Sequence, residues 1–358
     1  MVLCGGKSAE HEISVISARN ICKSVDLQRF DLSVVVIDKQ GTWSLRELVE
    51  LDAKAPNKMV SFEKSDSAWT LIQKEGRTFL IDPSSGESRA IDVVFPVLHG
   101  PNGEDGTMQG LLKIFNLPFV GPSVLGSAIA MDKEVAKRLL RDSGIDSAKF
   151  ISVRRHELGL LSYEQVSKVL GSTLFVKPAN MGSSVGVKKV TSATEFECAL
   201  REAFDFDHKV LIEESISGRE LEVAVMGNHP LLASVVGEIR PASKHGFYSY
   251  ESKYLDESGA ELIAPASLSA QDEANAKDLA LRAAAALECF GMVRVDMFLT
   301  AESRLLVNEL NTIPGFTNIS MYPRLWSLAG VDYARLISKL IDLALERSTA
   351  DNALKIGY

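Results

Sequence analysis

RVDMFLTAESRLLVNELNTIPGFTNISM, residues 294–321, is the stretch around which the rest of this chain is organised. Its segments VRVDMFL and RLLVNELN have the composition of β-strands, and the short polar run Ala301 to Arg304 joins them. A four-residue loop at that run places Thr300 opposite Leu305 in an antiparallel hairpin. We therefore predict a two-stranded hairpin with this register.

The same register places Asp296 opposite Glu309 and Arg294 opposite Asn311. Because side chains alternate between the two faces of a strand, these four side chains point the same way. Two carboxylates directly opposed across a ladder repel each other, and Mg²⁺ removes that repulsion because it takes oxygen ligands and shares them with substrate phosphates. The Pro-Gly turn that follows offers backbone N–H groups to an anion. The pattern indicates a metal–phosphate site, with a solvated, charged hairpin face as the alternative.

The composition of the whole chain limits its class. Its 358 residues, of which 46% are hydrophobic and 24% charged, favour two or three globular domains. The net charge of -8 gives no basic footprint, and no apolar run is long enough to span a bilayer, so neither nucleic acid nor a membrane is an expected partner. The cysteines lack CxxC spacing and neighbouring histidines, which indicates reduced thiols in a cytoplasmic protein. They are Cys4, Cys22, Cys198 and Cys289.

The first 122 residues alternate strand and helix patterns, which predicts an open α/β, Rossmann-like domain. In its opening MVLCGGKSAEHE, the run GGKS is not a Walker phosphate loop, because Met1 stands where that motif needs a glycine. Glu10 falls near the first turn of the next helix, where the helix dipole and a substrate role explain a carboxylate equally well. His99 ends the strand IDVVFPVLHG, either at a ligand-binding strand end or as a capped surface residue.

A second group of signals begins with a helix start. Asp132 is predicted to cap that helix, which places Lys133 in its first turn. The helix dipole disfavours a cation there, so either a nearby phosphate or a plain surface position explains Lys133. The run LFVKPANMGSSVGVKKV predicts a strand–loop–strand flap entered at Lys177, with a plain Gly-Ser hairpin as the alternative. Its loop contains Gly182, Ser183, Ser184 and Gly186.

Two connections in the second half of the chain are candidates for ligand contacts. Residues Glu213 to Ile216 predict an extended connector whose backbone can pair with a planar base. The segment Gly237 to Pro265 is long, polar and aromatic-rich without clear periodicity, and loops of that length in a compact domain are usually functional lids or disordered. Lys253 and Tyr254 lie in this predicted lid.

The chain carries a set of short motifs: GGKSAEHE, LHGPNGEDGTMQG, MDK, VKPANMGSSVGV, GRELEV, ESKYLD, RVD and NELNTIPGFTNISMYP. Together they closely resemble those of the D-alanine–D-alanine ligases, in the ATP-grasp superfamily. They run in family order from Gly5 to Pro323, so the resemblance covers nearly the whole chain. It implies a three-domain ATP-grasp architecture of the α/β class. The implied domains are residues 1–122 for the first D-alanine, 123–212 with the flap, and 213–358 with the Mg²⁺ site and lid.

The resemblance implies a two-step reaction. ATP phosphorylates the carboxylate of a first D-alanine, and the amine of a second D-alanine then attacks the acyl phosphate. The products are ADP, phosphate and D-alanyl-D-alanine for peptidoglycan precursors. Because phosphoryl transfer depends on positioning and charge neutralisation, it needs metals and lysines rather than a nucleophilic side chain. A homodimer is also implied.

The resemblance assigns roles to residues as well. Those implied to bind ATP are Lys133, Lys177, Ser184, Glu213, Glu214, Ile216 and Glu220. Two Mg²⁺ ions, or Mn²⁺, are implied at Asp296, Glu309 and Asn311. The implied catalytic set is Glu10, Ser183, Tyr254, Arg294 and Gly315, of which Arg294 and the Gly315 N–H match the oxyanion stabilisers. The implied substrate contacts are His99, Lys253, Ser320 and Met321.

Three other functions compete with this interpretation. A sibling ligase would join D-alanine to D-lactate or D-serine, but the lid pair Lys253-Tyr254 and Met321 favour D-alanine. A catalytically silent nucleotide-binding protein should have lost a metal carboxylate or the arginine beside it, and none is missing. A small-molecule kinase is disfavoured because Glu10 and Ser320, together with the lid, indicate sites for two amino acids.

Overall fold

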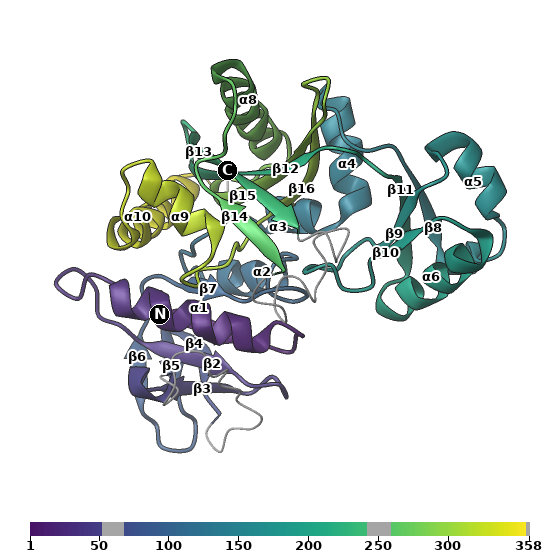
Figure 1. The fold of residues 1–358 in the computed structure, drawn as a ribbon. Coiled ribbons are helices and arrows are strands. Elements are labelled where there is room, and N and C mark those ends of the chain that lie inside the picture. Colours follow the sequence, from purple (N-terminus) through teal and green to yellow (C-terminus); the bar gives the residue numbers. More distant parts are fainter. Residues whose placement is uncertain (52–67, 242–258, 356–358) are drawn as a thin grey trace.

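The computed structural model describes residues 1–51, 68–241 and 259–355. Figure 1 shows three groups of elements: an N-terminal α/β group, a separate sheet with its helices in teal, and a larger sheet that carries the C-terminal helices. The α/β class predicted from the sequence is confirmed. Lys253 and Tyr254, with most of the predicted lid, lie outside the described residues.

The N-terminal group contains an open, mostly parallel sheet, as predicted. In sheet order its strands are β3 (Trp43–Arg46), β2 (Val34–Ile37), β1 (Val2–Gly5) and β7 (Phe95–Val97). A small antiparallel sheet contains β4 (Thr70–Lys74), β5 (Arg77–Ile81) and β6 (Ser88–Ala90). The helices are α1 (His11–Ser24), η1 (Leu48–Leu51) and α2 (Thr107–Ile114). Because β1 and β7 run parallel, the segments that follow them, with Glu10 and His99, leave the same edge of the sheet.

The second group is a four-stranded sheet with helices packed on it. Its order is β10 (Lys188–Val190), β9 (Leu174–Pro178), β11 (Lys209–Glu214) and β8 (Phe150–Arg154). The helices are η2 (Arg155–Glu157), α5 (Tyr163–Leu170) and α6 (Ala193–Phe206), and Ser162 and Ser192 cap α5 and α6. Since β9 and β10 pair antiparallel, the predicted strand–loop–strand flap is confirmed.

The third group is a five-stranded antiparallel sheet. Its order is β14 (Ala260–Ile263), β13 (Leu232–Pro241), β12 (Arg219–Gly227), β15 (Gly291–Leu299) and β16 (Leu305–Asn311). The helices around it are α3 (Val124–Met131), α4 (Lys133–Asp142), α8 (Ala270–Ala286), α9 (Met321–Leu328) and α10 (Tyr333–Asn352).

Alternate residues of β12 enter two different cores, as strand geometry requires. Leu221, Val223 and Val225 are buried with the side chains of α8, whereas Ala224 and Met226 are buried with those of α9 and α10. Helix α8 therefore seals one face of the sheet. The other face is covered by α9 and α10 at one end and carries the polar residues of the site at the other end.

The register of the β15–β16 hairpin confirms two of the predicted cross-strand pairs and contradicts the third. Asp296 pairs with Glu309, and Arg294 pairs with Asn311, as predicted. The prediction that Thr300 faces Leu305 is wrong, because Leu299 faces Leu305 and the Thr300 N–H donates to the Arg304 carbonyl at 2.9 Å. The loop is thus one residue shorter than predicted. A β-bulge at Asn308 inserts one residue into β16 and restores the predicted register at the carboxylates.

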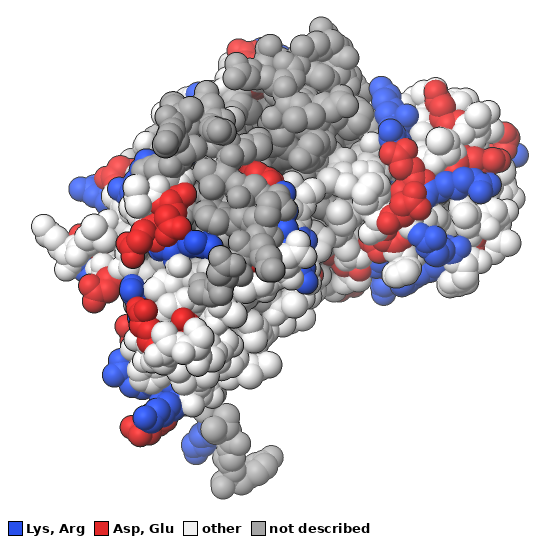
Figure 2. Space-filling view, turned by 90° about the horizontal axis from the view of Figure 1, so that it is seen from below, with Lys and Arg blue, Asp and Glu red and all other residues white. Residues whose placement is uncertain are grey.

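The described surface carries charges of both signs. In the view of Figure 2, Lys and Arg side chains lie intermixed with Asp and Glu over both visible lobes. Within the described ranges, no helix combines the length and apolar character needed to cross a membrane.

Candidate active site

A cavity of about 720 Å³ lies between the four-stranded and the five-stranded sheets. All the residues predicted to bind ATP line it: Lys133, Lys177, Ser184, Glu213, Glu214, Ile216 and Glu220. From the hairpin, Arg294, Asp296 and Glu309 line the same cavity. The fold therefore brings together residues that are up to 176 positions apart in sequence (309 − 133) and that the motifs had placed in one site.

The negative charges on this face of the hairpin are balanced by neighbouring cations. Arg294 holds Asp296 through two N–H groups, with Nε–Oδ1 and Nη2–Oδ2 both at 2.7 Å. The Asn311 amide donates to Asp296 Oδ2 at 2.9 Å, and Lys133 Nζ lies 3.4 Å from Glu309 Oε2. Each of the two opposed carboxylates thus has a cation beside it.

The donor set at this face fits a hard divalent cation that shares its ligands with phosphate. Asp296, Glu309 and Asn311 supply oxygen donors and no soft ligand. Among the described residues, no group of three or more His, Cys, Asp and Glu side chains could hold a metal ion on its own. Such a site needs further oxygen ligands from water or a substrate phosphate, which is how Mg²⁺ is usually bound.

A buried carboxylate fixes one of the cavity lysines. Glu213 Oε2 lies 2.8 Å from Lys177 Nζ, and Glu213 Oε1 lies 3.1 Å from Lys137 Nζ. Burial alone would raise the pKa of Glu213, but Lys137 and Lys177 together lower it, so the carboxylate stays charged. Sequence reasoning missed Lys137. Its spacing of four from Lys133 could have revealed it, because that spacing puts both lysines on one face of a helix.

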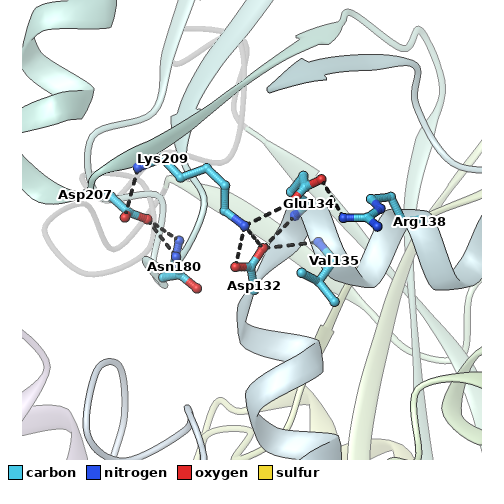
Figure 3. A network of polar contacts seen from close by, with 7 residues as sticks. All are labelled: Asp132, Glu134, Val135, Arg138, Asn180, Asp207 and Lys209. Carbon is cyan, nitrogen blue, oxygen red and sulfur yellow. Dashed lines mark hydrogen bonds and ion pairs between the residues drawn. The ribbon is translucent and has the colours of Figure 1, made fainter. Parts of the chain in front are cut away.

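The start of α4 is held by a second network, which Figure 3 shows. The Asp132 side chain caps the helix by accepting from the N–H groups of Glu134 and Val135, which confirms the predicted cap. The same carboxylate accepts from the buried Lys209 Nζ at 2.6 and 2.5 Å, and Glu134 Oε2 lies 3.0 Å from that nitrogen. Lys209 thus connects β11 to the helix that carries Lys133.

The base of the flap belongs to this network too. Asp207 Oδ2 accepts from both the backbone N–H and the side-chain amide of Asn180, at 2.8 and 2.9 Å (Figure 3). The Lys133 N–H donates to the Ala179 carbonyl at 3.1 Å, and Lys133 Nζ donates to the Met181 carbonyl at 2.8 Å. The position of Lys133 is therefore coupled to the backbone at the root of the flap.

The flap contacts the segment between β1 and α1 at Ser183. The Ser183 hydroxyl donates to the Glu10 carboxylate, across 173 positions of sequence. Ser183 and Ser184 both have left-handed backbones, with φ of 52° and 58°. Two members of the implied catalytic set, Glu10 and Ser183, are thus hydrogen-bonded to each other. Tyr254 lies outside the described residues.

Two further groups lie beside Glu10. His99 Nδ1 is 3.0 Å from the Ile313 carbonyl, whereas His99 Nε2 is buried without a hydrogen-bond partner among the described residues. Burial lowers the pKa of His99, which favours the neutral ring. Glu104, which sequence reasoning missed, accepts from the Gly100 N–H at 2.7 Å. Burial and the nearby Glu10 carboxylate raise the pKa of Glu104 to about 8.

The remaining predicted positions follow the hairpin. An added Cβ at Gly315 would meet Ser320 Oγ at 2.8 Å, so glycine lets this backbone approach the serine. Ser320 is the N-cap residue of α9, and its hydroxyl accepts from the Thr317 N–H at 2.9 Å. Met321 is buried in the core between α9 and the sheet. None of the three lines the 720 Å³ cavity.

The facing sheets, with Lys177 on one and a carboxylate hairpin on the other, define the ATP-grasp class of proteins. Family models described as "D-ala D-ala ligase N-terminus" and "D-ala D-ala ligase C-terminus" match residues 1–122 and 139–342. The chain belongs to the D-alanine–D-alanine ligase family.

Individual relatives match almost end to end. The D-alanine–D-alanine ligase of Shouchella clausii is 48% identical over 99% of this chain and 96% of its own length. D-alanine–D-alanine ligase A of Escherichia coli is 49% identical over 99% of this chain and 97% of its own length.

Solved structures of ligases from this family are similar to the chain over nearly its whole length. The D-alanine–D-alanine ligase of Coxiella burnetii has a TM-score of 0.82 and 35% identity, covering 98% of this chain and 96% of that one. The VanG D-Ala:D-Ser ligase of Enterococcus faecalis has a TM-score of 0.84 and 33% identity, covering 96% of this chain and 98% of that one.

Proposed function

We propose that this chain joins two D-alanines into D-alanyl-D-alanine for peptidoglycan precursor synthesis, converting ATP into ADP and phosphate. The observation that carries the proposal is the single cavity in which two lysines meet the opposed pair Asp296–Glu309. That arrangement neutralises phosphate charge from two sides, which is what phosphoryl transfer requires. Identity of 48–49% to D-alanine–D-alanine ligases over 99% of the chain favours D-alanine as the acceptor.

The ATP-binding roles follow from position in the cavity. Lys133 and Lys177 bind phosphate oxygens, with Lys177 held in place by Glu213. Ser184 lies at the flap, where the backbone covers the phosphates. The connector from Glu213 to Ile216 binds adenine, with Glu214 in that connector, and Glu220 binds ribose. ATP therefore lies between the two sheets.

Asp296, Glu309 and Asn311 would hold Mg²⁺, or Mn²⁺, as two ions shared with the ATP phosphates. When bound, the metal neutralises charge on the phosphates during transfer. Arg294 sits on the same face and, with the Gly315 N–H, donates to the oxyanion of the tetrahedral intermediate.

The amino-acid sites lie beyond the phosphates. Glu10, held by Ser183, binds the ammonium group of the first D-alanine, and His99 lies beside it. Ser320, with Met321 behind it, binds the carboxylate of the second D-alanine. Lys253 and Tyr254, which the resemblance also assigns to the substrate sites, lie outside the described residues. The deprotonated amine of the second D-alanine attacks the acyl phosphate, and phosphate leaves.

The assembly and location are part of the same proposal. We assign residues 1–122 to the first D-alanine domain, 123–212 to the central domain and 213–358 to the C-terminal domain. The active enzyme is a cytoplasmic homodimer.

The acceptor is tested by competition. With ATP, Mg²⁺, D-alanine and an equal concentration of D-lactate, the expected product is almost entirely dipeptide. A site built to bind an amine rejects an analogue that leaves its polar groups unpaired. Dipeptide formation should rise with pH through the neutral range as more acceptor amine loses its proton. Product composition by mass at several pH values is the measurement, and predominant ester at neutral pH would contradict the acceptor assignment.

Lys209→Met should weaken ATP binding selectively. Without the cation of Lys209, the Asp132 carboxylate is left uncompensated at the start of α4. Lys133, the next residue, is then held less firmly against the root of the flap. We expect the KM for ATP to rise about tenfold, because small displacements of a binding group are costly. The KM for D-alanine should change much less. Lys188→Met, which removes an exposed ion pair with Glu202, is the control. Equal changes in both KM values would show that Lys209 acts only on general stability.

Glu104 should make the free protein less stable as pH rises. A carboxyl whose pKa is raised from 4.5 to about 8 on folding binds its proton more tightly in the folded state. Its stabilising contribution is therefore complete below the unfolded pKa and is lost as pH rises toward the folded one. The thermal midpoint of the wild type should fall relative to that of Glu104→Gln between about pH 5 and pH 8. Parallel midpoint curves would contradict this.

A further inference from the structure

Glu222 is a buried carboxylate that the proposed function does not use. It lies on β12 and is only 4% exposed. The register pairs it with Asp296 on β15, and Asp296 in turn pairs with Glu309 on β16. Three carboxylates therefore stand in one row across three adjacent strands, and Glu222 is the member farthest from the outer strand of the hairpin.

Arg294 is shared between two members of this row. Its Nε lies 3.2 Å from Glu222 Oε1 and 2.7 Å from Asp296 Oδ1, while its Nη2 binds Asp296 Oδ2. Its directly paired neighbour on β12 is Ala224, which offers no polar side chain. The guanidinium group therefore extends across the ladder to the diagonal neighbour Glu222, over a distance that long side chains span.

The proposed metal site puts two demands on Asp296 that conflict. Asp296 gives both of its oxygens to Arg294 in this structure, yet a metal ligand must turn lone pairs toward the cation. When Asp296 binds a cation, that cation repels Arg294 and takes up part of the carboxylate's charge, so Asp296 holds Arg294 less firmly. The Arg294 side chain is only 20% exposed, so water hydrates its charge incompletely, and a second anion beside it keeps the guanidinium group paired.

We propose that Glu222 is the positioning residue that holds Arg294 in place while Asp296 serves the metal, an inference that rests on the proposed function. With Glu222 present, Arg294 can release Asp296 and still point at the oxyanion. Without Glu222, Arg294 stays on Asp296 and competes with the metal. Loss of Glu222 should then weaken metal binding, although Glu222 is not itself a ligand.

Two variants separate this role from simple charge. Glu222→Gln removes the charge at constant size, and Glu222→Asp keeps the charge but withdraws it by one methylene group. If Glu222 acts by contact with Arg294, both variants should bind Mn²⁺ in the presence of ADP at least about tenfold more weakly, as expected for one lost charged contact. Both should also lose kcat with little change in the KM for ATP. Electron paramagnetic resonance of free Mn²⁺ gives the affinity without turnover.

Glu238→Gln is the matched control. Glu238 is another buried carboxylate in the same sheet, 3% exposed and bound to Arg219 Nη2 at 2.6 Å. It should lose thermal stability like Glu222→Gln but keep wild-type Mn²⁺ affinity. Equal Mn²⁺ weakening in Glu238→Gln would assign the effect to general loosening of the sheet and overturn the proposal.

Three other outcomes also decide. If Glu222→Gln binds Mn²⁺ as tightly as the wild type, the proposal is overturned. It is also overturned if Glu222→Gln binds Mn²⁺ more weakly while Glu222→Asp binds it normally, because a negative charge without the contact to Arg294 would then be enough for metal binding. Weakening in both variants supports it. If the wild-type protein binds Mn²⁺ and ADP but forms no dipeptide, the proposed function fails, and the Mn²⁺ titration still tests the contact.

Discussion

Glu309→Gln is expected to lower the rate of dipeptide formation by roughly a thousandfold, because metal charge stabilisation is worth several kcal/mol and each factor of ten is about 1.4 kcal/mol. The glutamine keeps the size of the side chain but offers no negative charge to the metal. Glu309 is partly exposed, with Lys133 Nζ at 3.4 Å, so the fold should stay intact.

The rate is measured at saturating ATP and D-alanine over a range of Mg²⁺ concentrations. Glu302→Gln, in the exposed loop of the same hairpin, should behave like the wild type. A Glu309→Gln variant that turns over normally at ordinary Mg²⁺ would contradict the metal assignment.

Arg294→Lys should lower kcat by about a hundredfold, the usual cost of losing one oxyanion donor. Lysine keeps the charge, but its ammonium group is a point charge and lacks the planar fork that spans Asp296 with two N–H groups. The KM for ATP should change little, since the nucleotide is bound by other residues of the cavity.

Single-turnover kinetics separate the two chemical steps. Formation of ADP in the first turnover should stay closer to the wild type than formation of dipeptide, because the oxyanion arises in the second step. Arg304→Lys, an exposed pair with Asp146 at 3.3 Å, is the control. A normal kcat in Arg294→Lys would remove Arg294 from the oxyanion site.

The hairpin shows how far sequence reasoning reaches. Alternation along VRVDMFL and RLLVNELN predicted the faces correctly, and the register set by the assumed loop predicted the pairs Asp296–Glu309 and Arg294–Asn311. The loop length was wrong by one residue, and the bulge at Asn308 cancelled that error. A bulge changes the register without changing the residue types, so alternation alone does not reveal it.

The residues that sequence reasoning missed share a physical cause. Lys137, Lys209 and Glu222 are buried charges, and each is stabilised by partners from distant segments, such as Lys209 with Asp132. A buried charge is defined by what surrounds it, and that emerges only when the elements pack. The roles predicted for Lys253 and Tyr254 stay predictions, since both lie outside the described residues.

The central claim is that ATP activates the carboxylate of the first D-alanine as an acyl phosphate. In that step a carboxylate oxygen bonds to the γ-phosphorus, and the same oxygen leaves with phosphate when the second amine attacks. The most direct test supplies D-alanine with isotopically labelled carboxylate oxygens, together with ATP and Mg²⁺, and determines the released phosphate by mass. The expected result is one labelled oxygen in each phosphate and one phosphate for each dipeptide. Dipeptide formed with unlabelled phosphate would contradict it.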